Sequence, residues 1–398
     1  MRRTVLRVIT AALLAAPSPA AAQARVTLVP SVSVGSIYDD NLFARTIGTG
    51  DQMTLITPGL EASYETPVKL LLGAFSFDAQ RSFDHPALNE LAARRHGLAA
   101  GRFQLSPHFT LAFDGRYDRT DSAGDLSFVT GVLLDRQRAV RWQVGPSFAF
   151  RAAPRVTITG LYDWTTETVV GAEMSDEQVA RLGFTRQMTP RTTMGASYLG
   201  RRFVSAGETS TSTAALYSWS YEVAPATNLT LQGGPRYSSA RDAVLPEIVL
   251  ALGRKAATIV NYGFDYWRGE SIILGVLGPV EIHSGTAHIT WPIRQKVEVG
   301  VHGGVFNSQT LSQGHARVYH GELVNSWTLK APLVLTLSYG VDFQRGDVRT
   351  SLLSDKRITR QVVLVRLTAA PRLTRSLRPD DPLQPLEPLA DPVKGVKR

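Results

Sequence analysis

The chain has 398 residues, of which 43% are hydrophobic and 19% are charged, and this suits one large domain or two ordinary ones. It contains no cysteine, so disulfide bonds and thiolate chemistry are excluded. Lysine and arginine outnumber aspartate and glutamate by 43 to 34, but they are spread along the chain rather than clustered with aromatic residues. The sequence therefore does not indicate a nucleic-acid-binding surface.

Residues 1–22 have the layout of a secretory signal peptide. A basic start is followed by the apolar run Val8–Ala16 and by the small residues Ala20–Ala22 before Gln23. We expect cleavage near Ala22, and an amphipathic surface helix is the alternative. No later run reaches about 18 apolar residues, so no spanning helix is predicted. A secreted chain of this kind is expected to be a soluble all-β protein or a membrane β-barrel.

The segment His108–Arg119 shows the alternation of a β-strand with two different faces. Similar segments follow one another almost to the end of the chain. Tyrosine and tryptophan gather toward the ends of their apolar rows, as in the aromatic girdles of membrane barrels. In this segment one face carries Phe109, Leu111, Phe113 and Tyr117, and the other carries Thr110, Asp114, Arg116 and Asp118.

Short turn-like clusters recur along the chain and alternate with longer polar stretches. Proline suits such turns because it presets φ and does not continue a central strand. The alternation of short and long connections is typical of outer-membrane barrels, which have short periplasmic turns and longer outer loops. The clusters are Thr66-Pro67, Ser106-Pro107-His108, Ala152–Arg155, Thr189-Pro190-Arg191, Ala224–Thr227, Gly253-Arg254-Lys255, Arg294-Gln295-Lys296 and Ala331-Pro332-Leu333.

Strands on either side of these turns, with a first strand near Val26–Tyr38 and a last near Arg357–Thr368, bring the total to eighteen. The short strand Glu247–Gly253 is the least certain, so sixteen is the alternative count. The predicted fold is all-β: a transmembrane, antiparallel, up-and-down β-barrel over residues 23–370. A soluble sandwich or propeller is the alternative architecture.

Residues 371–398 are rich in proline and are expected to form a disordered periplasmic tail. A docking peptide for a partner is the alternative. The last predicted strand, Ile358–Leu367, lacks the terminal aromatic residue with which outer-membrane barrels commonly end. The insertion signal would then have to be internal.

The first strand runs into Ser33–Ala44, which contains Tyr38-Asp39-Asp40-Asn41 followed by Leu42-Phe43. This opening resembles the β-barrel porins associated with exopolysaccharide and exosortase gene clusters. The resemblance implies an outer-membrane channel that serves export of a secreted polysaccharide, and it brings no established set of functional residues. From the residues themselves, Asp39-Asp40-Asn41 is either a strand-to-loop turn or a cation site.

Alternation predicts a set of polar side chains that line the lumen. Mixed charges would bind a polyhydroxylated or acidic chain weakly at many points, which conduction requires, and arginines would favour carboxylates. Alternatively, these charges pair across neighbouring strands and hold the barrel's shape. The candidates are Arg102, Asp114, Arg116, Asp118, Asp163, Arg236, Asp265, His302, His320, Glu322, Asp342, Arg360 and Arg366, together with Asp78, Gln80, Gln104 and Gln344.

No histidine lies in a recognised catalytic pattern, so we expect no enzymatic activity. Glu322, on the same face as His320, is the nearest candidate for a third metal ligand beside His302, and no metal site is predicted from this group. No glycine-rich phosphate loop is present between a strand and a helix, so no nucleotide cofactor is expected.

The predicted function is an outer-membrane channel for export of a secreted exopolysaccharide, and the inward arginines favour an acidic one. Its partners would be outer-membrane lipid, the polymer and periplasmic export machinery. The alternatives are a general diffusion porin for small solutes and a plugged structural barrel that recruits a periplasmic partner through its tail. No connection is expected to plug the lumen, since a barrel of eighteen strands usually leaves a channel.

Overall fold

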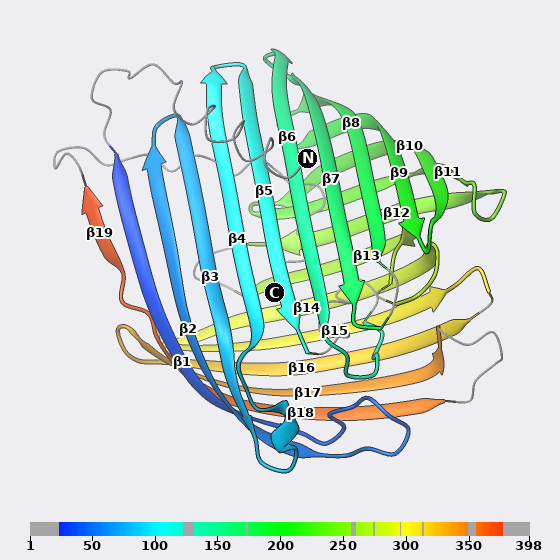
Figure 1. The fold of residues 1–398 in the computed structure, drawn as a ribbon. Helices are drawn as coiled ribbons and strands as arrows, with labels where there is room; N and C mark the ends of the chain where they lie inside the picture. The colour runs from blue at the N-terminus through cyan, green and yellow to red at the C-terminus, as the bar shows by residue number, and fades with distance from the viewer. Residues whose placement is uncertain are drawn as a thin grey trace.

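The computed structural model describes residues 24–121, 131–171, 174–255, 260–273, 275–294, 296–312, 314–348 and 356–376. The predicted signal peptide, residues 1–22, and the tail beyond Ser376 lie outside these ranges. Figure 1 shows the described strands forming one continuous curved wall. Among the described residues no helix is long and apolar enough to cross a membrane.

The wall is built from long antiparallel strands and one short 3₁₀ turn, η1 (Pro86–Leu88). The strands are β1 (Arg25–Asp39), β2 (Asp51–Thr66), β3 (Lys69–Ser82), β4 (Glu90–Ser106), β5 (Phe109–Thr120), β6 (Ala139–Ala153), β7 (Val156–Val169), β8 (Ser175–Thr189), β9 (Thr192–Ser205), β10 (Glu208–Ala224), β11 (Thr227–Ser238), β12 (Ala243–Arg254), β13 (Asn261–Ser271), β14 (Val280–Arg294), β15 (Val297–Gln309), β16 (His315–Lys330), β17 (Leu333–Asp347), β18 (Arg357–Ala369) and β19 (Leu373–Ser376).

The sheet closes on itself. From β2 to β17 each strand pairs with the strands before and after it in sequence, and β1 pairs with both β2 and β18. The structure is therefore a closed, antiparallel barrel of eighteen strands, as the sequence predicted. The predicted short turns all lie at the same end of the barrel, here called the turn end, and the longer connections lie at the loop end.

The paired part of the chain extends past residue 370, where the tail was predicted to begin. β19 pairs with the first residues of β1 in the register that β18 has with the rest of β1. That register places Pro371 opposite Pro30, and neither residue has an N–H to give to the ladder. β19 is thus the continuation of β18 after a local break, and the prediction of an unpaired tail from residue 371 is wrong for Leu373–Ser376.

The two faces of the wall differ as the alternation predicted. On β5, Leu111 and Phe113 are exposed on the outside, whereas Asp114, Arg116 and Asp118 belong to the inward series. Exposed aliphatic and aromatic side chains continue around the outside on every strand pair. Such an apolar belt around a closed barrel is the surface that a bilayer solvates.

Outward aromatic side chains form a band near each end of the barrel, and others, among them Tyr162, Tyr198 and Tyr217, lie between the two bands. Amphipathic rings at these two heights are typical of a barrel whose ends lie at membrane–water interfaces. The band at the turn end contains Tyr64, Phe103, Phe109, Phe150, Trp219, Tyr221, Tyr262, Trp291 and Trp327, and the band at the loop end contains Tyr38, Tyr117, Trp142, Trp164, Tyr237, Tyr319 and Phe343.

The two faces can be tested with one charge placed on either side of the wall. Leu182 on β8 is 56% exposed on the outside, and Thr159 on β7 is exposed at the same height on the inside. We expect Leu182→Arg to destabilise the barrel in lipid by about 2–4 kcal/mol, because it places a charge in hydrocarbon. Thr159→Arg should cost less than about 1 kcal/mol. Unfolding by urea in lipid vesicles measures both, and equal costs would contradict a lipid-facing exterior.

Candidate functional site

The lumen is the candidate functional site. The strand registers place every predicted lining residue on the inward series, so each side chain arises from the predicted face of the wall. These side chains differ in how far they are exposed. Arg236 is completely buried and Asp118 is 2% exposed, whereas His320 and Arg116 are about 40% exposed at their side chains. Whether these residues line a conducting path stays a prediction.

Many of the inward charges pair with a neighbouring strand. Asp118 accepts bonds from His96 Nδ1 at 2.8 Å and from Arg116 Nε at 2.5 Å. Arg141 on β6 pairs with Glu167 on β7, and His320 on β16 contacts Asp342 on β17 at 2.7 Å. These pairs favour the reading in which charges hold the shape of the wall. His320, which was considered as a metal ligand, bonds to Asp342 instead. No group of three potential metal ligands occurs among the described residues.

In the half of the lumen nearest the turn end, many inward side chains carry hydroxyls, and they lie among charged and apolar side chains such as Arg102 and Leu72. Several of the hydroxyls bond to each other across strands, as Ser33 does to Thr368 at 2.8 Å and Ser220 to Thr230 at 3.1 Å. These inward residues are Thr27, Ser63, Thr110, Thr157, Thr159, Thr185, Thr193, Ser218, Ser220, Thr230, Thr290, Ser326, Thr336, Thr368 and Ser33.

Toward the loop end, a layer of buried apolar side chains crosses the lumen, and we call it the septum. Inward residues of β6 and β7 belong to it, and so do inward residues of β15 and β16, which lie half the circumference away. Chain segments from two loop-end connections fill the space between them. The septum contains Val132, Leu134, Ala139, Val169, Ile273, Val276, Val280, Ile282, Phe306, Ala316, Val318 and Val348.

The septum corrects the expectation of a lumen without a plugging connection, because two connections enter it. The connection between β5 and β6 contributes Val132 and Leu134, and the connection between β13 and β14 contributes Ile273 and Val276. Both lie at the end of the barrel that the sequence pattern assigned to the outer loops. The signal that would have identified them is the short apolar run in each, Gly131–Leu134 and Ile272–Val276, since apolar side chains in a loop seek a buried site.

The end of the β13–β14 hairpin leaves the wall. β12 and β13 are paired only from Arg254–Tyr262 to Ile248–Arg268. Beyond that point, Glu270 and Glu281 lie on the face that continues the outside of the barrel, yet they contact Ser238 and Arg236, which point inward from β11. Residues 269–273 and 275–283, here called the inward hairpin, therefore lie inside the lumen against the inner surface of β11, while residues 281–283 stay paired with β15.

A chain of charges joins the inward hairpin to the wall. Arg201 on β9 donates two bonds to Glu247 on β12, at 2.8 and 2.5 Å. Arg236 lies between Glu247 and Glu281 and hydrogen-bonds to Glu281. Glu281 also accepts a bond from Arg268 Nε at 3.2 Å. The hairpin thus meets β9–β12 through polar groups, while its other face belongs to the septum.

The far end of the hairpin and the β5–β6 connection are each tied to a distant strand. Ser271 Oγ donates to Glu177 Oε2 on β8 at 2.9 Å. The backbone N–H of Leu133 donates to Gln344 Oε1 on β17 at 2.7 Å, and the Leu133 side chain packs with Ala44 and Ile358. Both segments are therefore fixed across the lumen rather than resting at its rim.

The segment Tyr38–Asn41 lies where the first and last strands meet. Asp39 is 1% exposed at its side chain and accepts bonds from Arg360 Nε and Nη2 on β18, at 3.0 and 2.7 Å. Asp40 Oδ1 accepts the N–H of Gln361 at 2.6 Å. Asn41 holds the following loop through Arg45 and bonds to the carbonyl of Thr359 at 2.9 Å. These contacts support the turn interpretation of this segment over a cation site.

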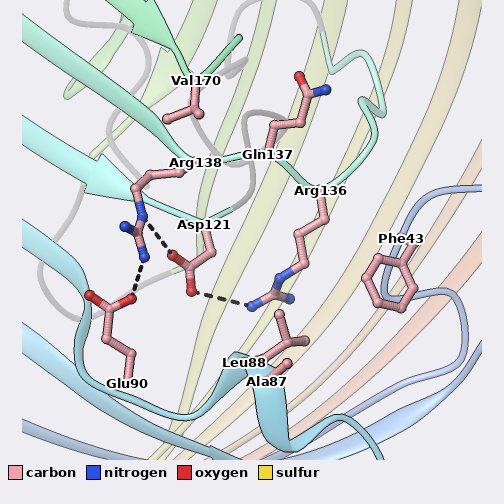
Figure 2. Close-up of a pocket in the computed structure, with 9 residues that line it drawn as sticks. All are labelled: Phe43, Ala87, Leu88, Glu90, Asp121, Arg136, Gln137, Arg138 and Val170. Carbon is pink, nitrogen blue, oxygen red and sulfur yellow. Dashed lines mark hydrogen bonds and ion pairs between the residues drawn. The ribbon is translucent and has the colours of Figure 1, made fainter.

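A small recess opens beside the loop end, with a volume of about 350 Å³. Figure 2 shows Arg138 between Glu90 and Asp121, with Arg136 on the other side of Asp121. Burial raises the pKa of the Asp121 carboxyl, and Glu90 adds to this rise, whereas the two arginines oppose it. Because the pKa is raised, the charged carboxylate is less favourable in the folded protein than in the unfolded chain.

The seam between β1 and β18 can be tested through Asp39. We expect Asp39→Asn to destabilise the barrel by about 3 kcal/mol, because it removes the partner of the largely buried Arg360. Asp40→Asn is the matched control, and its cost should stay below about 1 kcal/mol since that carboxylate is more accessible. Urea midpoints in detergent measure both. Equal effects would show that the buried pair does not hold the seam.

The pKa of Asp121 predicts how stability varies with pH. The unfavourable charge is fully present above the raised pKa and disappears as the carboxyl protonates at lower pH. We therefore expect Asp121→Asn to raise the urea midpoint at pH 7, and the difference from the wild type to vanish below about pH 4. Glu90→Gln serves as the control and should not raise the midpoint at pH 7, because it removes bonds to Arg119 and Arg138. A lower midpoint for Asp121→Asn at pH 7 would contradict the assignment.

Comparison with known proteins gave no match to any family model and none to the curated proteins. Among solved structures, the chain is similar to the siderophore receptor PirA from Pseudomonas aeruginosa, with 10% identity, a TM-score of 0.40 and coverage of 89% of this chain and 81% of that one. It is also similar to OccK11 (OpdR) from the same organism, with 11% identity, a TM-score of 0.45 and coverage of 88% and 96%. The FrpB iron transporter from Neisseria meningitidis gives 8% identity, a TM-score of 0.43 and coverage of 82% and 63%. The strand count and the closure of the barrel rest on the pairings themselves.

Proposed function

We propose that this chain is an outer-membrane channel through which a secreted polysaccharide leaves the periplasm. The apolar exterior and the two aromatic bands support a position in a bilayer. In such barrels the short turns face the periplasm and the longer connections face outward. The turn end is then the periplasmic entrance, and the septum lies near the cell exterior. No catalytic step is part of this proposal.

The observation that carries the proposal is the difference between the two halves of the lumen. The periplasmic half presents serine and threonine hydroxyls, which exchange weak hydrogen bonds with a polyhydroxylated chain along its whole length. The septum crosses the outer half. A polymer entering from the periplasm would thus meet a permissive wall first and a barrier last, which is the order that suits export.

Arg366 is the residue that we propose for contact with an acidic sugar. It arises from β18 in the half of the lumen nearest the turn end, opposite Thr336 on β17 and Gly35 on β1. A guanidinium group binds a carboxylate through two parallel bonds. Arg141, Arg201 and Arg360, by contrast, are engaged by wall carboxylates. The preference for an acidic polymer therefore depends on few arginines.

The septum separates this proposal from its two alternatives. A general diffusion porin needs a continuous aqueous path, and an apolar layer across the lumen does not provide one. A permanently plugged structural barrel is favoured by the same layer. It differs from a channel in one measurable property, which is whether the barrel conducts once the septum has been opened.

Deletion of the gene tests the export function. We expect surface polysaccharide to disappear and the polymer to accumulate in the periplasm, as measured by surface staining and by cell fractionation. The wild-type gene should restore export, and Arg366→Gln should restore it several-fold less well if the polymer is acidic. Normal surface polymer in the deletion strain would refute polysaccharide export and would direct attention to solute uptake.

A further inference from the structure

We propose that the inward hairpin is a hinged gate, which opens the lumen by returning to the wall beside β12. The proposal goes beyond the channel function in naming the moving part, the strand that receives it and the line about which it bends. Three features of the molecule support it: the break in the wall, the buried charges behind the hairpin and the glycines in the strands that would bend.

The wall has a ready position for the hairpin. β12 begins at Ala243, but its pairing with β13 reaches only Ile248. The edge residues Ala243–Glu247 therefore face the gap that the hairpin leaves. Continuing the existing register would place Gly269 beside Glu247 and Glu270 beside Pro246. The open edge is blunted by Pro246, which has no N–H to leave unpaired.

The contacts between the inward hairpin and the wall behind it are of a kind that can be broken when the hairpin moves. Its polar face is held by charges rather than by close apolar packing. Arg236 has Glu247 and Glu281 as ion-pair partners, but its Nε and Nη1 atoms and Glu270 Oε2 are buried and make no hydrogen bond to the described residues. A buried polar atom without a hydrogen bond costs stability, and a buried ion pair adds little net stability even when it is complete. These contacts therefore add little net stability to the closed position.

Glycines occur in each of the strands that would bend. Gly269 on β13 follows directly on the last residue paired with β12. Gly285 on β14 pairs with Val305 on β15, next to Gly304, and Gly303 lies opposite Gly321 on β16. A Cβ at Gly285 would meet no atom within 4 Å, so close packing does not require a glycine there. Glycine within a strand permits sharp bending, so these strands each contain a position at which they can bend.

The septum would divide along a defined boundary. β14 remains paired with β15 up to Gln309, so Val280 and Ile282 move together with Phe306. The part that stays behind contains Val132 and Leu134 of the β5–β6 connection, with the inward ends of β6 and β7. Opening therefore separates two apolar surfaces and leaves a passage between them, while most strand pairings persist.

Two engineered cysteine pairs test the gate, because the chain has no cysteine of its own. Both pairs use Glu270→Cys. The closed pair adds Ser238→Cys, since Ser238 Oγ lies 2.9 Å from Glu270 Oε1. The open pair adds Pro246→Cys, which reaches position 270 only when the hairpin has joined β12. A control pair, Ser220→Cys with Thr230→Cys, joins two inward residues of adjacent wall strands.

Disulfide formation is read by gel mobility and conductance in planar bilayers, before and after reduction. We expect oxidation of the closed pair to lower conductance at least tenfold, and reduction to restore it. The open pair should form a disulfide and hold the barrel in a conducting state. The control pair should leave conductance unchanged. Glu281→Gln should increase the time spent open, whereas Glu322→Gln should not.

The outcomes separate the gate from the channel on which it depends. Unchanged conductance with the closed pair fully oxidised would overturn the gate and leave the channel function standing. Failure of the open pair to form under any condition would overturn the movement to β12. Formation of the open pair without conductance would confirm the movement and refute the channel function.

Discussion

Complete pairing of the backbone is the constraint on which this structure depends. In a bilayer no water is present to satisfy a free N–H or C=O, so a sheet must close upon itself. Closure joins β1 to β18, the two strands farthest apart in sequence, and the seam is where the Asp39–Arg360 pair lies. The residues that first suggested a family resemblance therefore have a structural task, because they fasten the end of the chain to its beginning.

The fold could be predicted because its rules are local. A period of two identifies each strand, and proline-marked turns identify one end of the barrel. Residues such as Leu111 and Asp114 lie on the predicted faces because a strand in a closed barrel has little freedom to rotate. The break at Pro371 was read as the end of the sheet, whereas β1 extends beyond it and pairs with β19. Whether residues after Pro371 are paired depends on how far β1 extends, and β1 is distant from them in sequence.

The interior could not be predicted in the same way. Alternation places Arg236 on the inner face correctly, but it does not tell what covers that face. The element that covers Arg236 is the inward hairpin of β13 and β14, and the alternation of these two strands does not predict that they bend inward. Apolar residues such as Ile273 and Leu134 are the sequence feature that indicates an inward fold, because apolar side chains in a loop are usually buried. A loop in a barrel of this size should therefore be judged by its apolar content before its length.

The way in which the lumen is filled has a consequence for how it can open. A barrel of eighteen strands is too wide for its own side chains to fill, and here the filling comes from two connections and from the ends of wall strands. Moving the inward hairpin out of the lumen would therefore change the wall itself. β12 stands with a free edge while the hairpin is inside, so blocking the lumen and completing the wall are alternative uses of the same residues. Competition between two pairings of one segment is what makes a sheet bistable.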